Sequence, residues 1–237
     1  MFLKVSTLLL IPSLVIQGYR VKKYTPRLEE ASGQRQGKMG KGKALSVLIL
    51  GDSAAAGVGV QHQQDALLGA LLKQLEHDFE VYYQLEAKTG DTTLQVLERT
   101  KQLNHQSFDV VITSVGVNDV TKLISPKKWI LQQQQFYAEI ESRFSPKKIV
   151  VTGVPPMNLF PALPNPLGWL LGQYSSAMNK QLSQFVNTKP HYQLIQFDLA
   201  HFKALNLQMA EDGFHPSKDI YQLWAKEISQ VIFNKFQ

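Results

Sequence analysis

Short apolar runs alternate with amphipathic stretches from residue 44 to the end of the chain, the pattern of a parallel sheet covered by helices. Runs rich in Val, Ile and Leu predict buried strands over residues 45–50, 81–87, 108–115, 148–153 and about 192–197. Apolar residues at helical spacing predict helices over residues 68–79, 92–104, 126–143 and 171–187, and a last helix through residues 220–231. The predicted fold class is therefore α/β, a three-layer α/β/α arrangement with five parallel strands.

The first 23 residues have a different pattern. A mainly apolar stretch from Val5 to Tyr19 is followed by Arg20, Lys22 and Lys23. It is shorter than the about 20 apolar residues that a membrane-spanning helix needs, and no Ala-x-Ala cleavage signal follows it. An aromatic residue and cations at the end of an apolar stretch are typical of a helix held at an anionic lipid surface. Residues 1–23 are therefore interpreted as a membrane-directed segment.

Positive charges flank this segment, and the positive-inside rule then predicts that the folded domain lies on the cytoplasmic face of the inner membrane. The alternative is an exported, periplasmic domain behind an uncleaved or differently cleaved secretion signal. Residues 24–43 are rich in Gly, Gln and Lys and are interpreted as a flexible basic tether. The folded domain is predicted to occupy residues 44–237.

The net charge of +6 is concentrated near the amino end: residues 1–43 hold nine of the 25 Lys and Arg residues but only two of the 19 acidic ones. The rest of the chain is close to neutral, which argues against nucleic acid as a partner. The chain has no cysteine, and its six histidines form no His-Glu-x-x-His pair or other short metal-ligand spacing. Neither a metal nor a cofactor is expected.

Candidate chemistry begins where the first predicted strand ends. Ser53 stands there in Gly-Asp-Ser, among small residues that permit a tight turn. A helix after Ser53 would direct the positive end of its dipole at an anion formed beside the hydroxyl, which makes Ser53 a candidate nucleophile. The alternative is an ordinary serine cap of a helix. A nucleotide-binding loop is disfavoured, because the glycines fit neither Gly-x-Gly-x-x-Gly nor P-loop spacing.

Two further strand ends and one turn supply partners for Ser53. Gly90 offers an unobstructed backbone N–H and Asn118 a side-chain amide, and with the N–H of Ser53 they form a candidate oxyanion hole. Asp212 stands three residues before His215 in a turn, where it can bond the imidazole and leave the other ring nitrogen facing Ser53. Taken singly, each has a structural alternative: a plain turn, a helix cap, or a surface turn with an incidental histidine.

Together these segments resemble the four blocks of the SGNH hydrolases, also called the GDSL esterase and lipase family, in the right order over residues 45–235. The blocks are Gly-Asp-Ser at 51–53, Gly90, Gly-x-Asn-Asp at 116–119 and Asp-x-x-His at 212–215. The resemblance implies a flavodoxin-like sheet and an acyl-enzyme mechanism without a cofactor. It also implies site residues: a triad of Ser53, His215 and Asp212, an oxyanion hole from Ser53, Gly90 and Asn118, and supporting roles for Asp52, Gly116 and Asp119.

The substrate is less defined, since the family includes arylesterases, lysophospholipases, thioesterases and carbohydrate deacetylases. Ala54 replaces the family's usual leucine after the serine and leaves room for an acyl chain. The long, proline-rich connection over residues 154–170 carries apolar residues that we expect to form an acyl-binding wall: Met157, Leu159, Phe160, Leu163, Leu167 and Trp169. The alternative is ordinary packing of a long loop.

The expected function is that of a serine hydrolase (esterase or lipase) acting on a small-molecule or lipid ester, with a preference for apolar esters. The alternatives are a carbohydrate deacetylase or an acyltransferase of the same fold, and a non-catalytic binding module.

Overall fold

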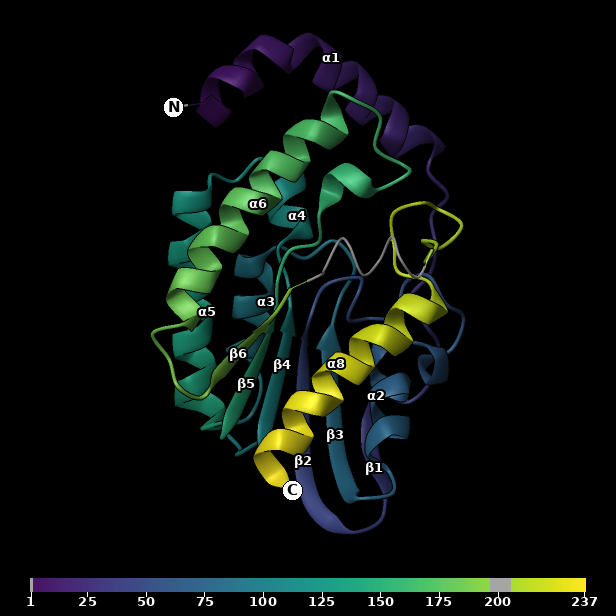
Figure 1. Cartoon of the computed structure of the whole chain (residues 1–237), viewed down its shortest axis with the longest axis vertical. Coiled ribbons are helices and arrows are strands. Elements are labelled where there is room, and N and C mark those ends of the chain that lie inside the picture. Colours follow the sequence, from purple (N-terminus) through teal and green to yellow (C-terminus); the bar gives the residue numbers. More distant parts are fainter. Residues whose placement is uncertain (1, 197–205) are drawn as a thin grey trace.

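The computed structural model describes residues 2–196 and 206–237, which form a three-layer α/β/α domain around one sheet (Figure 1). Within these residues the sheet has six strands in the order β1-β3-β2-β4-β5-β6. The five predicted strands are all present and parallel to one another, which confirms the predicted fold class. They are β2 (Lys43–Gly51), β3 (Phe79–Ala87), β4 (Val110–Ser114), β5 (Lys148–Thr152) and β6 (Tyr192–Ile195). Residue 197, the last residue of the last predicted strand, lies outside the described residues.

The sixth strand, β1 (Gln36–Gly40), lies in the stretch interpreted as a flexible tether, and the structure corrects that interpretation for these residues. β1 pairs antiparallel with β3 at the edge of the sheet, from Gln36 opposite Gln84 to Gly40 opposite Glu80. Its residues are all exposed and none is β-branched, so the sequence carries no strand pattern here. The strand forms because the edge of β3 offers unpaired backbone groups.

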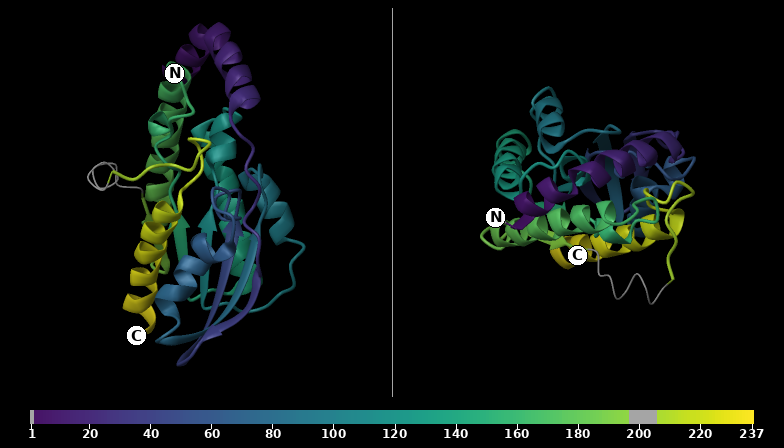
Figure 2. Two further views of the ribbon diagram at one scale, coloured as in Figure 1. Left: turned by 90° about the vertical axis from the view of Figure 1, so that its right-hand side faces the viewer. Right: turned by 90° about the horizontal axis from the view of Figure 1, so that it is seen from above.

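Side chains alternate between the two faces of the sheet, and a separate group of helices covers each face (Figures 1 and 2). Leu48 and Leu50 of β2 share an apolar core with α3 (Thr93–Thr100), α5 (Pro126–Phe144) and α6 (Leu167–Val186). Val47 and Ile49 of the same strand share the other core with α2 (Leu67–Leu75) and α8 (Lys218–Phe236). Both faces are covered, which explains why the strands are continuous apolar runs.

Helix boundaries differ from the prediction where a neighbouring element takes the residues. The first helix of the domain, α2, ends at Leu75, because Phe79 begins β3 opposite Lys43. The ring of Phe79 packs on Phe233 of α8 at a centroid distance of 5.9 Å, which places this side chain in the core from a strand. Helix α6 begins at Leu167, earlier than predicted, and so includes the end of the proline-rich connection.

Residues 2–24 form helix α1 (Phe2–Tyr24), which lies across the end of the molecule toward which the parallel strands point (Figures 1 and 2). It packs along α6, and Gln17 Nε2 donates to Asn165 O at 2.7 Å while Gln17 Oε1 accepts from Leu167 N at 3.0 Å. Several apolar residues of α1 are exposed: Val5, Leu8, Leu9, Ile11, Val15 and Ile16. In the described part of the chain, no helix combines the length and the apolar character needed to span a bilayer.

The carboxyl ends of four parallel strands meet at one edge of the sheet. Gly51 of β2 is in register with Ala87 of β3 and Ser114 of β4, and Ser114 is in register with Thr152 of β5. The loops after these strands therefore lie beside one another, where α/β sheets gather reactive groups.

Candidate active site

Ser53 is a buried residue in a tight turn two positions after β2. The turn needs Gly51, because a Cβ there would lie 2.5 Å from Ala55 Cβ and 2.6 Å from Ser114 O. The helix that we expected directly after Ser53 is not formed: residues 53–59 make successive turns, with Val58 N donating to Ser53 O at 3.0 Å. A long helix dipole therefore does not point at Ser53, and the polarity of the site comes from individual N–H groups.

His215 lies just before α8, and its Nε2 is 3.0 Å from Ser53 Oγ. Two contacts bring these distant segments together. Gly59 passes so close to the segment after His215 that a Cβ would lie 2.2 Å from Pro216 O. The hydroxyl of Tyr221 in α8 lies 2.9 Å from Ala54 O and 2.7 Å from the carbonyl oxygen of residue 58. The start of α8 is thus attached to the turn that carries Ser53.

The second ring nitrogen of His215, Nδ1, lies 2.5 Å from Asp212 Oδ2. Asp212 Oδ1 accepts the backbone N–H groups of Phe214 and His215, each at 2.9 Å. Burial raises the pKa of Asp212, but the hydrogen bonds from the imidazole and the two N–H groups outweigh it, and the pKa lies below its ordinary value. The ionised carboxylate can only accept, so Nδ1 carries the proton and the lone pair of Nε2 faces the Ser53 hydroxyl.

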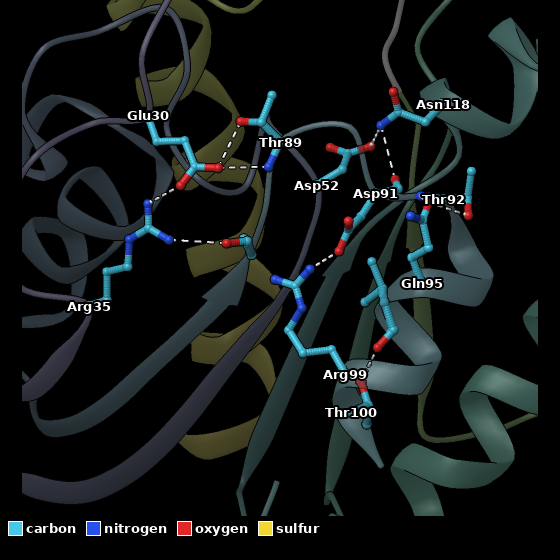
Figure 3. Close-up of polar contacts among 12 residues, drawn as sticks. Glu30, Arg35, Asp52, Thr89, Asp91, Thr92, Gln95, Arg99, Thr100 and Asn118 are labelled. Atoms are coloured by element: carbon cyan, nitrogen blue, oxygen red, sulfur yellow. Dashed lines mark hydrogen bonds and ion pairs between the residues drawn. The ribbon is translucent and has the colours of Figure 1, made fainter. Parts of the chain in front are cut away.

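Asn118 links the segments of Ser53 and Gly90, because its side chain contacts Asp52, next to Ser53, and Asp91, next to Gly90. Gly90 has a φ of +85°, in the left-handed region that favours glycine, and no atom lies within 4 Å of the position its Cβ would take. Asn118, in the short helix α4 (Val117–Thr121), donates from Nδ2 to Asp91 O at 3.0 Å (Figure 3). The backbone N–H groups of Ser53 and Gly90 donate to no residue of the described ranges, so both are available to a ligand.

Asp52 lies between Ser53 and Asn118 and is 2 % exposed. Its Oδ1 accepts from Ala54 N at 3.2 Å, and its Oδ2 accepts from Asn118 Nδ2 at 3.4 Å (Figure 3). Burial, with repulsion from Asp119, raises the pKa of Asp52 to about 7 in spite of these hydrogen bonds. At neutral pH this carboxyl is therefore partly protonated, whereas that of Asp212 is ionised.

Asp119 and Gly116 shape the loop that presents Asn118. Asp119 Oδ2 accepts from both N and Oγ1 of Thr93, each at 2.9 Å, which ties this loop to the start of α3. Gly116 has a φ of +132°, and a Cβ there would lie 2.6 Å from Val154 Cγ2. Both residues therefore contribute to the conformation of residues 116–119, and their supporting role in the reaction stays a prediction.

Three residues beside Gly90 were missed by sequence reasoning: Glu30, Arg35 and Thr89 (Figure 3). Glu30 Oε1 accepts from Thr89 N at 2.7 Å and from Thr89 Oγ1 at 2.8 Å. Glu30 and Arg35 stand in a stretch without helical or strand periodicity, and the contact joins positions 59 apart in the sequence. No local signal in the sequence identifies them.

A cavity of about 360 Å³ opens beside Ser53, within the range of roughly 300–1,000 Å³ that is common for small-molecule sites. Its lining is mainly apolar and comes from the turn of Ser53, the connection after β5, residues 206–209 and the start of α8. Ala54 is part of the lining, as expected for a small residue that leaves room. Across residues 2–196 and 206–237, no group of three or more His, Asp or Glu side chains is placed to hold a metal ion.

The expected acyl-binding wall is only partly formed by the residues that we named. Leu159 and Phe160 line the cavity, and Phe160 packs edge-on against Phe214 at a centroid distance of 5.1 Å. The other four predicted residues lie elsewhere: Met157, Leu163 and Leu167 are buried in the apolar core, and Trp169 is exposed outside the lining. Most apolar residues of this connection are thus needed for packing, because α6 begins within it.

A serine, a histidine and a carboxylate in contact form the arrangement that serine hydrolases on several unrelated folds share. The sequence profile of the GDSL-like lipase/acylhydrolase family matches residues 49–223, and the chain belongs to this family. This match confirms the resemblance seen in the four sequence blocks. No curated protein matches the chain significantly.

Solved structures of similar fold include several esterases. The psychrotrophic esterase EstA from Pseudoalteromonas sp. is 20 % identical, with a TM-score of 0.60 over 80 % of this chain and 97 % of that chain. The aryl esterase of M. smegmatis is 16 % identical, with a TM-score of 0.60 over 81 % and 100 %. Axe2, an acetylxylan esterase from Geobacillus stearothermophilus, is 17 % identical, with a TM-score of 0.56 over 82 % and 96 %. At these identities the similarity shows the fold alone.

Proposed function

We propose that this protein is a carboxylic ester hydrolase in which Ser53 is the nucleophile, His215 the general base and Asp212 the residue that orients His215. One observation carries the proposal: Ser53 Oγ, the His215 ring and Asp212 form an unbroken chain with links of 3.0 Å and 2.5 Å. The carboxylate fixes the imidazole tautomer, and the free nitrogen faces the hydroxyl. This is the arrangement that general-base activation of a serine requires.

In the first half-reaction, Ser53 Oγ forms a bond to the ester carbonyl carbon while its proton passes to His215 Nε2. The tetrahedral intermediate then breaks its bond to the leaving alcohol oxygen, which takes that proton from His215. In the second half-reaction, a water molecule gives a proton to His215 and attacks the acyl-enzyme. The acid leaves, and Ser53 regains its proton.

The oxyanion of each tetrahedral intermediate needs donors that are already in place. The backbone N–H groups of Ser53 and Gly90 and the Asn118 amide are proposed as these donors, since the first two are unused within the described structure and the third adjoins them. Donors in such a hole stabilise the transition state more than the ground state.

The primary test compares Ser53→Ala with Ser229→Ala, whose hydroxyl bonds only within α8. We expect Ser53→Ala to lower hydrolysis of a short activated aryl ester by at least about 10⁴-fold, with an unchanged melting temperature. The Ser229→Ala control should retain its activity. Undiminished turnover in Ser53→Ala contradicts the assignment, and absent turnover in the wild type on every ester tried favours a binding module.

The cavity supports an apolar acyl group as the substrate feature that is recognised. Its apolar lining, which includes Ala54, Leu159 and Phe160, suits a hydrocarbon chain better than a sugar acetate. A series of nitrophenyl esters of increasing chain length tests this, with kcat/KM expected to rise from acetyl toward medium chains. A strong preference for acetyl favours a deacetylase, and product esters formed with added alcohols reveal acyl transfer.

We also propose that α1 binds an anionic membrane surface. The exposed residues Leu8 and Leu9 provide apolar area, and the cations Arg20, Lys22 and Lys23 lie near the carboxyl end of the same helix. Binding to vesicles that contain phosphatidylglycerol, compared with phosphatidylcholine alone, tests the proposal. Replacing both leucines by serine should weaken binding, whereas Leu131→Ser, a similarly exposed site on α5, should not.

For location, we propose the cytoplasmic face of the inner membrane, on the basis of the flanking cations. Protease added to intact spheroplasts should then leave the domain uncut. Digestion under those conditions favours the exported alternative.

A further inference from the structure

An arm of the chain, residues 30–35, lies before the region matched by the family profile and joins two loops of the site. On one side it is attached to the segment after Ser53. Ser32 N donates to Gln61 O at 2.9 Å, and Gln63 N donates to Ser32 O at 2.8 Å. The side chain of Gln63 donates to both Ala31 O, at 3.1 Å, and Ala56 O, at 2.9 Å. The arm is therefore anchored to the nucleophile side of the site.

On its other side the arm holds the loop of Gly90, residues 87–91 (Figure 3). Glu30 Oε1 accepts from both N and Oγ1 of Thr89, at 2.7 and 2.8 Å. Arg35 Nη2 donates to Glu30 Oε2 at 2.7 Å, and Arg35 Nη1 donates to Ala87 O at 3.0 Å. The ion-paired arm residues Glu30 and Arg35 thus bind both the start of the loop and the residue directly before Gly90.

The Gly90 loop needs such support because its tip is not packed. No atom lies within 4 Å of the place where a Gly90 Cβ would be, and its positive φ is a conformation that glycine leaves readily. Thr89 itself has no other hydrogen-bond partner in the described part of the chain. The rest of the loop is held by Lys88 N to Gly51 O and Asp91 N to Lys88 O, each at 3.3 Å, by Asn118 Nδ2 to Asp91 O at 3.0 Å, and by an ion pair of Asp91 with Arg99. The short, charge-assisted contacts to Glu30 are the strongest that hold Thr89 in place.

Glu30 remains charged in this position. Its burial raises the pKa, but hydrogen bonds from Thr89 and Arg35 and the attraction of the guanidinium outweigh burial, so the pKa lies below its ordinary value. A charged acceptor holds the Thr89 N–H more firmly than a neutral one.

We propose that Glu30 is a positioning residue for the oxyanion hole: it fixes Thr89 so that the next peptide N–H, that of Gly90, points toward the substrate oxyanion, with Arg35 holding Glu30. The inference rests on the proposed function, because it assigns a role to a donor of that reaction. Glu30 itself contacts no reacting atom and acts through the backbone of residues 89 and 90. It extends the active site to a segment that lies outside the family region.

The test uses Glu30→Ala and Glu30→Gln, with Glu80→Gln as a matched control. Glu80 on β3 bonds Lys38 of the edge strand at 3.0 Å, so its variant perturbs the same sheet edge without touching the Gly90 loop. For Glu30→Ala we expect kcat to fall roughly 10-fold to 100-fold with KM within about 2-fold, less than the roughly 10²–10³-fold cost of losing a donor outright. Glu30→Gln keeps an acceptor oxygen but loses the ion pair, so its loss should be smaller.

A fluorophosphonate provides a second readout, since its adduct places a phosphoryl oxygen where the oxyanion forms. Its rate of labelling of Ser53 should fall in the same order, Glu30→Ala below Glu30→Gln below wild type, and stay unchanged in Glu80→Gln. Equal kcat in Glu30→Ala and wild type overturns the positioning role. A fall in kcat that also appears in Glu80→Gln, or that varies with the melting temperature of the variants, overturns it too. If wild type itself is unlabelled at Ser53, the proposed function fails first.

Discussion

Two loops at the same edge of the sheet support the two halves of the site in opposite ways. The turn of Asp212 and His215 is held by its own residues: Asp212 accepts N–H groups two and three positions ahead, and Ala210 N donates to His215 O at 2.9 Å. The loop of Gly90 is held from outside, by Glu30, Arg35 and Asn118.

The difference shows which part of the site depends only on neighbouring residues and which part depends on distant ones. A turn that satisfies its own backbone is specified by a few neighbouring residues, so its motif is readable in the sequence. A loop whose geometry depends on partners far along the chain has no such motif, and changes in a remote segment reach it. We therefore expect the triad to be sensitive to substitutions within it, and the oxyanion side to be sensitive also to residues outside the family blocks.

Asp212→Asn is the sharpest test of the self-contained turn. The amide oxygen still accepts the N–H groups of Phe214 and His215, while the amide nitrogen faces His215 Nδ1 and favours the tautomer that protonates Nε2. Activity on an aryl ester should fall about 10⁴-fold, with a fall in melting temperature at neutral pH too small to unfold the protein. Activity within a few-fold of wild type contradicts the role of Asp212 in selecting the tautomer.

Asn118→Ala tests the externally supported side. It removes one proposed oxyanion donor and the contact to Asp91 O, so kcat should fall roughly 10²–10³-fold with a smaller change in KM. Thr121→Ala, which removes only an exposed hydroxyl that bonds Asn118 O, serves as the control and should stay near wild type. A rise in KM with kcat unchanged shows instead that Asn118 binds substrate and transition state alike.

Asp52→Asn tests a contrast between two buried carboxyls of the site, Asp52 and Asp212, whose pKa values shift in opposite directions. The pKa of Asp52 is raised to about 7 in the folded chain. Between about pH 4 and pH 7 the Asp52 carboxyl is therefore ionised in the unfolded chain and protonated in the folded chain. As pH rises through this range, the free energy of unfolding falls. The amide resembles the protonated acid, so the variant escapes this cost. At pH 8 its melting temperature should exceed that of wild type by ~3 °C, which corresponds to a gain of about 1 kcal/mol in the free energy of unfolding. At pH 4 the difference should be smaller.

For Asp212 the dependence of stability on pH has the opposite sign. Its pKa is lowered in the folded chain, so the stability it contributes is present above the ordinary carboxyl range and is lost as pH falls through the lowered value. Thermal melts of wild type, Asp52→Asn and Asp212→Asn from pH 3 to pH 8 separate the two. A gain in Asp52→Asn that is independent of pH contradicts the buried-charge explanation.

Much of the fold was readable from the sequence, because the strands are buried on both faces and therefore appear as unbroken apolar runs. All five parallel strands were predicted within a few residues. The edge strand β1 was not, since Gln36–Gly40 buries nothing and forms only because β3 offers a free edge. Phe79 was assigned to a helix because a buried aromatic at the right spacing fits either element.

The site follows the same rule. Ser53 stands in a short motif at a strand end, and Asp212 and His215 stand in another in the turn before α8. The structure brings the three side chains into contact. Glu30 and Arg35 become part of the site only because the arm packs beside Thr89. No spacing in the sequence predicts that contact. The acyl wall was overestimated because apolar residues in a long loop pack the core as readily as they line a cavity.

The most direct test of the central claim is labelling with a fluorophosphonate probe, followed by mass spectrometry of the modified peptide. We predict a single adduct on Ser53 in the wild type, none in Ser53→Ala, and labelling that is much slower in His215→Ala because the hydroxyl then has no base. Wild-type protein that stays unlabelled, or an adduct that persists elsewhere in Ser53→Ala, would contradict the assignment of Ser53 as an activated nucleophile.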